Sequence, residues 1–416
     1  MLRDNSRKTR WRGRDPHWTP LVSGQSQEEI FHLLHLVSTT LWGQREHLKG
    51  TFSTGLPGAA LFLGYLSRLP GFEDQKARAL ELLTRSVHEI SNNPLPSFYN
   101  GFIGVAWSLE HLNTHALYLN DEDLNADVDD YLLELIEENT GETWDLIDGC
   151  IGWGIYAIER LPRWKSIDLL EKNLSLLSRQ GVTAGLGRFW FEGKDLLLPK
   201  DLQSALPMDH VNLGVAHGLV GILRYLAAMV EIESLSEASR TQFYQTFHWL
   251  KDHLQEPIHG AFLCSRIGLD REHPTTEKTR LAWCHGDLGA SFALLTASAI
   301  LDDPEVEELA YQMALLAADR SKENDPGMDW SLCHGSAGAC HVFHRWHQAT
   351  GQDEFQNAAL QYLNLTVEHC RRELSQEDLE FYKLADFLQG LSGVGLSLLS
   401  AASNLYPSWD KCLLLG

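Results

Sequence analysis

The chain has 416 residues, of which 44% are apolar and 10% aromatic, so it has enough apolar residues for a sizeable core and is not globally disordered. Its formal net charge of −22 at pH 7 excludes a typical nucleic-acid binder and disfavours anionic lipid, whereas a cationic peptide would be attracted. No apolar run approaches the ~20 residues of a membrane-spanning helix, and the N-terminus lacks the apolar stretch of a secretory signal.

The beginning of the chain is basic and polar. Residues 1–20 are therefore predicted to form a flexible N-terminal tail. No low-complexity linker interrupts the rest, so we expect residues 21–416 to form a single domain. The seven cysteines, an odd number without a signal peptide, predict reduced thiols and a cytoplasmic protein.

A recurring G-x-x-G motif, each time followed by an apolar run typical of a helix, organises the chain. Its seven copies begin at Gly55, Gly101, Gly149, Gly218, Gly286, Gly335 and Gly390, at intervals of 46 to 69 residues. Self-similarity of this kind indicates a repeat architecture. Most of these glycines are expected to be architectural, because glycine permits sharp turns and close backbone approach.

Amphipathic segments with helical periodicity precede the motifs, whereas the runs that follow them are apolar on most sides. The amphipathic segments include Glu28–Trp42, Asp74–Ile90, Leu124–Glu138 and Glu305–Arg320. Apolar helices must be buried all round, so the alternation predicts an all-α fold, an α/α toroid of seven inner and seven outer helices. The two long intervals predict loop or small-strand insertions near residues 181–212 and 256–281.

Three consecutive copies of the motif carry histidine directly before the first glycine: His217, His285 and His334. Two of them add a cysteine before that histidine, Cys284 and Cys333. Equivalent positions of neighbouring repeats converge at one end of a toroid, so these side chains are expected to meet. Two thiolates and an imidazole suit tetrahedral zinc with an open fourth position. A lone buried cysteine is usually an inert core residue, but repetition at one register argues against that interpretation.

Other polar residues lie near the motifs. Asp148 occupies the histidine register of the third copy, and Asp145 precedes it by three residues. Either carboxylate could equally cap a helix. Arg280, four residues before Cys284, would by itself be typical of a surface or ion-paired arginine.

The combination of seven G-x-x-G motifs with W-C-H-G, C-H-G and A-H-G resembles the lanthionine synthetase C-like cyclase family over residues 51–399. That family has a toroid of seven inner and seven outer helices. The resemblance implies zinc ligands at Cys284, Cys333 and His334 and catalytic residues at His217, Asp145 and Arg280. His285 and Asp148 are candidates for supporting positions around them, and for His285 a further proton carrier or an inert residue is the alternative. One departure concerns His285, since well-known bacterial members have tyrosine there and glutathione-binding eukaryotic relatives have histidine.

The activity implied is zinc-dependent formation of lanthionine and methyllanthionine rings. Cysteine thiols would add, by intramolecular Michael addition, to dehydroalanine or dehydrobutyrine in a dehydrated precursor peptide. His217 would serve as the acid or the base, Asp145 would orient it, and Arg280 would stabilise the enolate or hold its loop. The alternative is a cyclase-like protein that binds glutathione or other thiols without ring formation.

The same resemblance implies a separate dehydratase and an exporter as partners, and a cytoplasmic location at the periphery of a membrane-associated complex. Two other classes of toroidal enzyme fit less well. A protein prenyltransferase would need a basic cluster for its diphosphate, which the sequence lacks. A glycosidase would rely on paired carboxylates, and Asp145 with Asp148 is a weak pair beside two cysteines and their histidines.

Overall fold

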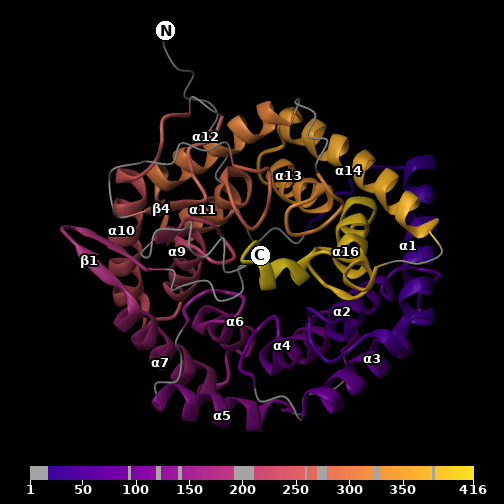
Figure 1. Ribbon diagram of the computed structural model, residues 1–416, viewed down its shortest axis with the longest axis horizontal. Coiled ribbons are helices and arrows are strands. Elements are labelled where there is room, and N and C mark those ends of the chain that lie inside the picture. Colours follow the sequence, from indigo (N-terminus) through magenta and orange to yellow (C-terminus); the bar gives the residue numbers. More distant parts are fainter. Residues whose placement is uncertain are drawn as a thin grey trace.

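The computed structural model describes residues 17–91, 95–118, 123–138, 143–191, 210–257, 260–268, 279–321, 328–376 and 380–416. In these ranges the helices form two concentric layers around a common axis, and the chain runs once around the ring (Figure 1). Inner and outer helices alternate along the sequence, as the sequence pattern predicts.

The inner layer consists of the helices that follow the G-x-x-G motifs. Within the described ranges these are α2 (Leu56–Leu66), α4 (Phe102–Leu112), α6 (Cys150–Glu159), α9 (Leu219–Met229), α11 (Asp287–Leu301), α13 (Ser336–Thr350) and α16 (Leu391–Ala402). Every residue of α2 and of α16 is buried. Their apolar composition on all sides therefore matches their position between the outer layer and the centre.

The outer layer is made of the amphipathic helices. In the described part of the chain these are α1 (Gln25–Gly43), α3 (Gln75–Ile90), α5 (Ala126–Glu137), α7 (Trp164–Gln180), α10 (Ser236–Asp252), α12 (Pro304–Arg320) and α14 (Asp353–Leu374). Each buries one face, as in α3, where five of sixteen residues are buried. Helix α16 packs against α2 and α1, which closes the ring. The predicted α/α toroid with seven inner and seven outer helices is confirmed.

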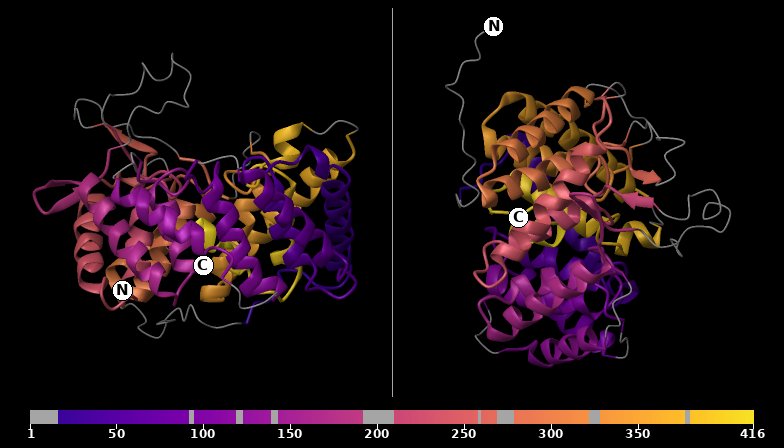
Figure 2. Two further views of the ribbon diagram at one scale, coloured as in Figure 1. Left: turned by 90° about the horizontal axis from the view of Figure 1, so that it is seen from below. Right: turned by 90° about the vertical axis from the view of Figure 1, so that its left-hand side faces the viewer.

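The two long intervals contain short strands. Strand β1 (Val182–Ala184) pairs antiparallel with β2 (Gly187–Phe189), and β3 (His210–Asn212) pairs antiparallel with β4 (Arg266–Gly268). The pairing of β3 with β4 joins the two insertions to each other. Figure 2 shows these strands on one face of the ring. The parts of the predicted insertions at residues 192–209, 258–259 and 269–278 lie outside the described residues.

The ends of the described chain both pack on the ring. Trp18 is 4% exposed and donates a hydrogen bond from Nε1 to the Ser400 carbonyl at 2.7 Å, while residues 1–16 of the predicted tail lie outside the described residues. The C-terminal segment, with the short helix η4 (Ser408–Leu413), lies at the centre of the ring (Figure 1). Among the described helices, none combines the length and the apolarity needed to cross a membrane.

The remaining short elements are η1 (Arg45–His47), the π turn η2 (Asn113–Leu117) that continues α4, and α15 (Phe381–Ala385).

A closed circle of backbone hydrogen bonds joins the loops that precede the seven inner helices. Each loop donates one such bond to the next loop around the ring. The donor is an amide two or three residues before a motif glycine, and the acceptor is a carbonyl two or three residues before the next motif glycine. The donor and acceptor pairs are Ser53 and Tyr99, Tyr99 and Ile147, Leu146 and Ala216, Val215 and Cys284, Trp283 and Cys333, Cys333 and Leu388, and Phe387 and Phe52. Equivalent positions of neighbouring repeats are thereby held side by side on one face.

Candidate active site

The glycines of the motif allow the cysteine-bearing loop to cross closely over the start of α11. Gly286 has φ +86°, a left-handed conformation that side chains other than glycine rarely adopt. A Cβ on Gly289 would overlap the carbonyl oxygen of Trp283. Cys284 lies between these two constraints, so its side chain is positioned by a backbone path that only glycine permits.

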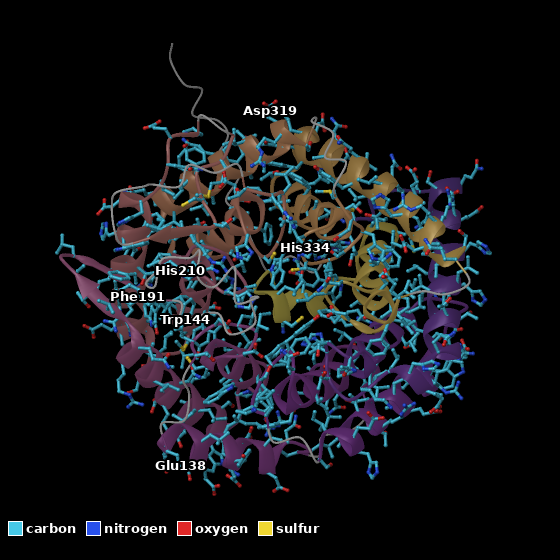
Figure 3. The ribbon with its side chains drawn as sticks, viewed as in Figure 1. Glu138, Trp144, Phe191, His210, Asp319 and His334 are labelled. Carbon is cyan, nitrogen blue, oxygen red and sulfur yellow. The ribbon has the colours of Figure 1, made fainter. Side chains whose placement is uncertain are left out.

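Cys284, Cys333 and His334 are brought together by the circle of loops. The ligand atoms of the three side chains all lie within 4.8 Å of one another. The amides of Trp283 and Cys284 donate to the Cys333 carbonyl at 3.0 and 3.3 Å, which places the two cysteines on adjacent loops. Cys284 is 8% exposed, Cys333 and His334 are half-buried, and Figure 3 shows His334 near the centre of the ring.

The electrostatics favour a thiolate at Cys284. A hydrogen bond from Cys333 is the largest contribution that holds the pKa of Cys284 well below its usual value, and hydrogen bonds from His285 and His334 add to it against the effect of burial. The same interaction with Cys284, followed by burial, raises the pKa of Cys333. The sulfur of Cys284 is therefore the one of the two that favours the negatively charged thiolate form at neutral pH.

His334 is oriented by a carboxylate behind it. Its Nε2 lies 3.2 Å from Asp329 Oδ2, which leaves Nδ1 available as a metal ligand. The hydrogen bond with Asp329, and then that with Cys284, raises the pKa of His334 to about 9. Burial would raise the pKa of Asp329, but hydrogen bonds from His334 and Ser331 outweigh it and bring that pKa to about 2. A carboxylate that fixes the tautomer of a histidine is common around protein metal sites.

His217 and Asp145 form a second polar pair on the neighbouring loops. His217 Nδ1 lies 2.5 Å from Asp145 Oδ2, and Asp145 Oδ1 accepts from the Asp148 amide at 2.8 Å. One oxygen of Asp145 therefore shapes its own loop while the other orients the imidazole. The His217 side chain is 34% exposed, so a substrate can reach its ring. The amide of Val215 donates to the Cys284 carbonyl at 2.9 Å, which puts the His217 loop directly beside the Cys284 loop.

The two predicted supporting residues have different surroundings. His285 is half-buried, and its Nε2 lies 3.5 Å from Asn212 Nδ2 beside the Cys284 sulfur. Asp148 accepts hydrogen bonds from Ser97 Oγ at 2.5 Å and Asn100 Nδ2 at 3.1 Å. Asp148 therefore links the second and third loops, and within the described residues no hydrogen bond joins its side chain to Cys284 or Cys333.

Arg280 is exposed at the start of the Cys284 loop. Its guanidinium makes no hydrogen bond or ion pair within the part of the chain that the structure describes, so it is not brought into contact with the other predicted site residues. The remaining five cysteines are buried elsewhere. Burial raises the pKa of Cys340 and of Cys370 to about 12, in contrast with Cys284.

Comparison with known proteins places this chain. The model of a family described as lanthionine synthetase C-like protein matches residues 46–414. The chain belongs to the lanthionine synthetase C-like family.

The nisin biosynthesis protein NisC of Lactococcus lactis subsp. lactis is 25% identical over 384 residues, which cover 88% of each chain. A solved structure of a nisin cyclase superposes with a TM-score of 0.73 at 20% identity, covering 92% of this chain and 97% of that one. At that identity the superposition shows a common fold, an α/α toroid. The sequence resemblance to the family is confirmed.

The positions of the three predicted ligands can be compared with the geometry that a zinc ion requires. Zinc–sulfur distances of about 2.3 Å and zinc–nitrogen distances of about 2.0–2.1 Å in a tetrahedral site separate the ligand atoms by roughly 3.4–3.8 Å. The ligand atoms of Cys284, Cys333 and His334 lie within 4.8 Å of one another, so small side-chain movements would suffice. Two thiols, one of them with a lowered pKa, and an imidazole held by Asp329 are a suitable donor set.

Two carboxylates near this site, Asp329 and Asp386, are not among the residues that the sequence predicted. Asp329 lies six residues before its motif glycine and holds His334. Asp386 lies four residues before Gly390, as Asp145 does before Gly149, and accepts hydrogen bonds from the Gln389 amide at 2.8 Å and from the Tyr99 hydroxyl. That shared spacing was a signal in the sequence that could have identified Asp386.

Proposed function

We propose that this member of the lanthionine synthetase C-like family is a zinc-dependent cyclase. It would form lanthionine and methyllanthionine in a dehydrated precursor peptide. The observation that carries the proposal is the convergence of Cys284, Cys333 and His334 on adjacent loops, next to the hydrogen-bonded pair of His217 and Asp145. The name of the relative NisC supports a peptide of the nisin class as the kind of substrate.

The proposed reaction is an addition without loss of atoms or electrons. The substrate sulfur forms a bond to the β-carbon of a dehydro residue as the carbon–carbon π bond breaks, and a proton is delivered to the α-carbon. Bound zinc, held by Cys284, Cys333 and His334, would lower the pKa of the substrate thiol from about 8.5 into the neutral range. Asp145 fixes Nδ1 of His217 as the protonated nitrogen, so Nε2 would take the thiol proton and return it to the α-carbon.

The remaining roles follow from position. Arg280 is exposed at the entrance of the Cys284 loop, where its charge would stabilise the developing enolate oxygen of a peptide bound on this face. His285 would supply a further hydrogen bond beside Cys284. We also propose that a separate dehydratase prepares the substrate, that an exporter receives the product, and that the enzyme acts in the cytoplasm beside that complex.

The test compares wild type with Cys284→Ala and Cys333→Ala in zinc content and in ring formation. Ring closure leaves the peptide mass unchanged, so free thiols are counted by alkylation and mass spectrometry after incubation with a dehydrated peptide. We expect one zinc per wild-type chain at the cysteine site, its loss in both variants, and disappearance of alkylatable thiols with wild type but with neither cysteine variant. The variant His47→Ala, at an exposed residue of η1, is the control.

Two outcomes would overturn the proposal. A folded wild-type protein that takes up no zinc at Cys284 and Cys333 would rule out the metal-dependent reaction. A zinc-loaded protein that leaves every peptide thiol free but consumes glutathione would instead support the alternative of a glutathione-handling relative, which the histidine at position 285 favours.

A further inference from the structure

A second group of metal-ligating side chains lies at the other ends of the inner helices. His111 is in the last turn of α4, His115 is in the π turn η2, and Glu159 is the last residue of α6. One ligand atom from each lies within 4.8 Å of the others. Because α6 begins at the loop with Asp145 and Asp148, its ten residues place this group about 15 Å away, on the face opposite the cysteines.

The spacing of the three groups is close to that of a metal site. Glu159 Oε1 is 2.8 Å from His111 Nδ1 and 3.0 Å from His115 Nε2. Ligand atoms of a tetrahedral zinc, bound at about 2.0–2.1 Å, are separated by roughly 3.3 Å. Glu159 Oε1 therefore needs to move away from each histidine nitrogen by only a few tenths of an ångström, and the two nitrogens lie within 4.8 Å of each other. Two histidines and a glutamate form a ligand set that zinc uses widely.

The surroundings of His111 favour ligation through Nδ1. Its ring is fully buried and stacks on Trp107, with ring centroids 4.4 Å apart and an interplanar angle of 13°. At the other edge of the His111 ring, Nε2 lies 2.8 Å from the Tyr65 hydroxyl. If Nδ1 bound a metal, the proton of His111 would reside on Nε2 and be donated to Tyr65. Such a hydrogen bond behind a ligating histidine orients the ring.

The charge of Glu159 is at present compensated by an ammonium group. Lys411 Nζ, from the C-terminal segment, lies 3.4 Å from Glu159 Oε2 and 3.2 Å from His115 Nε2. The Glu159 side chain is only 4% exposed, whereas that of Lys411 is 39% exposed. Lys411 borders a hollow of about 660 Å³ that is also lined by His115 and Glu159. The lysine therefore has space to withdraw, and a cation and a water molecule have a route to the ligands.

We propose that His111, His115 and Glu159 form a second divalent-cation site, distinct from the cysteine site, for which Lys411 competes as a tethered cation. Zinc is the cation that this ligand set and its spacing favour. Withdrawal of the Lys411 ammonium would open the site, and the hollow would supply the fourth ligand as water. Occupancy would thus depend on the C-terminal segment, which carries Lys411 into the centre of the ring.

The test measures zinc uptake by the full chain with the cysteine site removed. In the Cys284→Ala, Cys333→Ala protein we expect one zinc per chain at saturation by equilibrium dialysis. Adding His115→Ala should weaken that binding at least about 100-fold, because it removes one of three ligands. Adding Lys411→Met should strengthen it at least about tenfold, because the competing cation is gone while the aliphatic stem remains.

Controls separate the site from general zinc adsorption and from loss of the fold. His47→Ala in the same background should leave zinc uptake unchanged, and thermal unfolding should show that each variant is folded. In the otherwise wild-type chain, His115→Ala should retain the zinc at the cysteine site. The proposal is overturned if the cysteine-free protein takes up no zinc, or if Lys411→Met lowers stability without strengthening zinc binding. Either result would leave the cluster as an ion-paired network.

Discussion

The side chains of the cysteine site divide into groups that would hold the metal and groups that would move protons. Cys284, Cys333 and His334 come from the loops before α11 and α13, whereas His217 and Asp145 come from those before α9 and α6. Each imidazole has a carboxylate partner, Asp329 for His334 and Asp145 for His217. Each carboxylate fixes which nitrogen faces the substrate side.

Replacing His217 tests its proposed role in proton transfer. We expect His217→Asn to lower kcat/KM for ring closure by about 100-fold or more while zinc content stays the same, because general acid–base catalysis contributes on that scale. Asp145→Asn should cause a smaller loss, since Asn Oδ1 can still accept the Asp148 amide but no longer stabilises a charged imidazole. Thiol alkylation over time gives the rates. Unchanged rates in His217→Asn would contradict the assignment.

The pH dependence of zinc binding tests the electrostatics of the donor set. The pKa of His334 is raised to about 9 and that of Cys333 is raised well above its usual value, so both groups carry protons at pH 7 that zinc must displace. Zinc affinity should therefore fall as pH falls, by about tenfold per unit for each displaced proton. Competition with a chelator at pH 6, 7 and 8 measures this. A constant affinity over that range would contradict it.

At the scale of elements, the site depends on how each loop enters its inner helix. A loop must pass directly over the first turn of the helix that follows, and its amide must reach the carbonyl of the next loop. The pair Trp283 and Cys333 makes such a bond at 3.0 Å. Gly289, the second glycine of this copy of the motif, permits the crossing, because a Cβ there would meet the Trp283 backbone of the same loop.

Gly289→Ala tests this geometry without changing any polar group. The added Cβ would overlap the Trp283 carbonyl oxygen, so we expect a loss of about 2–4 kcal/mol in the free energy of unfolding and a displaced Cys284. Zinc affinity should fall with it. Gly43→Ala, where a Cβ meets no atom within 4 Å, is the matched control and should be neutral or slightly stabilising. Chemical denaturation of both variants checks the comparison, and equal stabilities would refute it.

At the scale of the whole molecule, the C-terminal segment ties the centre of the ring together. Asp410 accepts hydrogen bonds from Arg345 Nη2 at 2.6 Å and from Arg345 Nε at 2.8 Å. His341 Nε2 lies 2.7 Å from the same carboxylate, and Asp410 and His341 are almost fully buried. Trp283, next to Cys284, donates to the Leu413 carbonyl at 2.9 Å. The central segment thus supports the cysteine loop from within.

Removing the central carboxylate should be far more costly than removing a surface charge. We expect Asp410→Ala to lower the free energy of unfolding by about 3–5 kcal/mol, because it leaves the buried Arg345 without its counter-charge. Lys172→Ala, which breaks a surface pair with Glu137, should cost about 1 kcal/mol or less. Denaturant titrations of the two variants provide the measurement. A loss in Asp410→Ala no larger than in the control would show that the buried pair contributes little.

The sequence alone determined the two-layer helical fold and the register of the cysteines and histidines. Helical periodicity, burial of apolar runs and glycine spacing are local properties, so they can be read without coordinates. The tertiary structure decided which of these residues meet. The circle of backbone hydrogen bonds brings Cys284 against Cys333, and no local pattern reports a bond between loops about fifty residues apart. The contact of Asp329 with His334 also became visible only in the structure, because the path of the loop, not the spacing of five residues, sets which side chains meet within it.

The group of metal-ligating side chains on the opposite face of the ring shows the same difference between what the sequence and the tertiary structure determine. His111 and His115 are spaced by four residues in the sequence, but Glu159 and Lys411 reach them from other parts of the chain. Their approach depends on where α6 ends and on the path of the C-terminal segment through the centre. Both are set by how the inner and outer helices pack into one ring, and packing of distant segments is the property that a single sequence does not display.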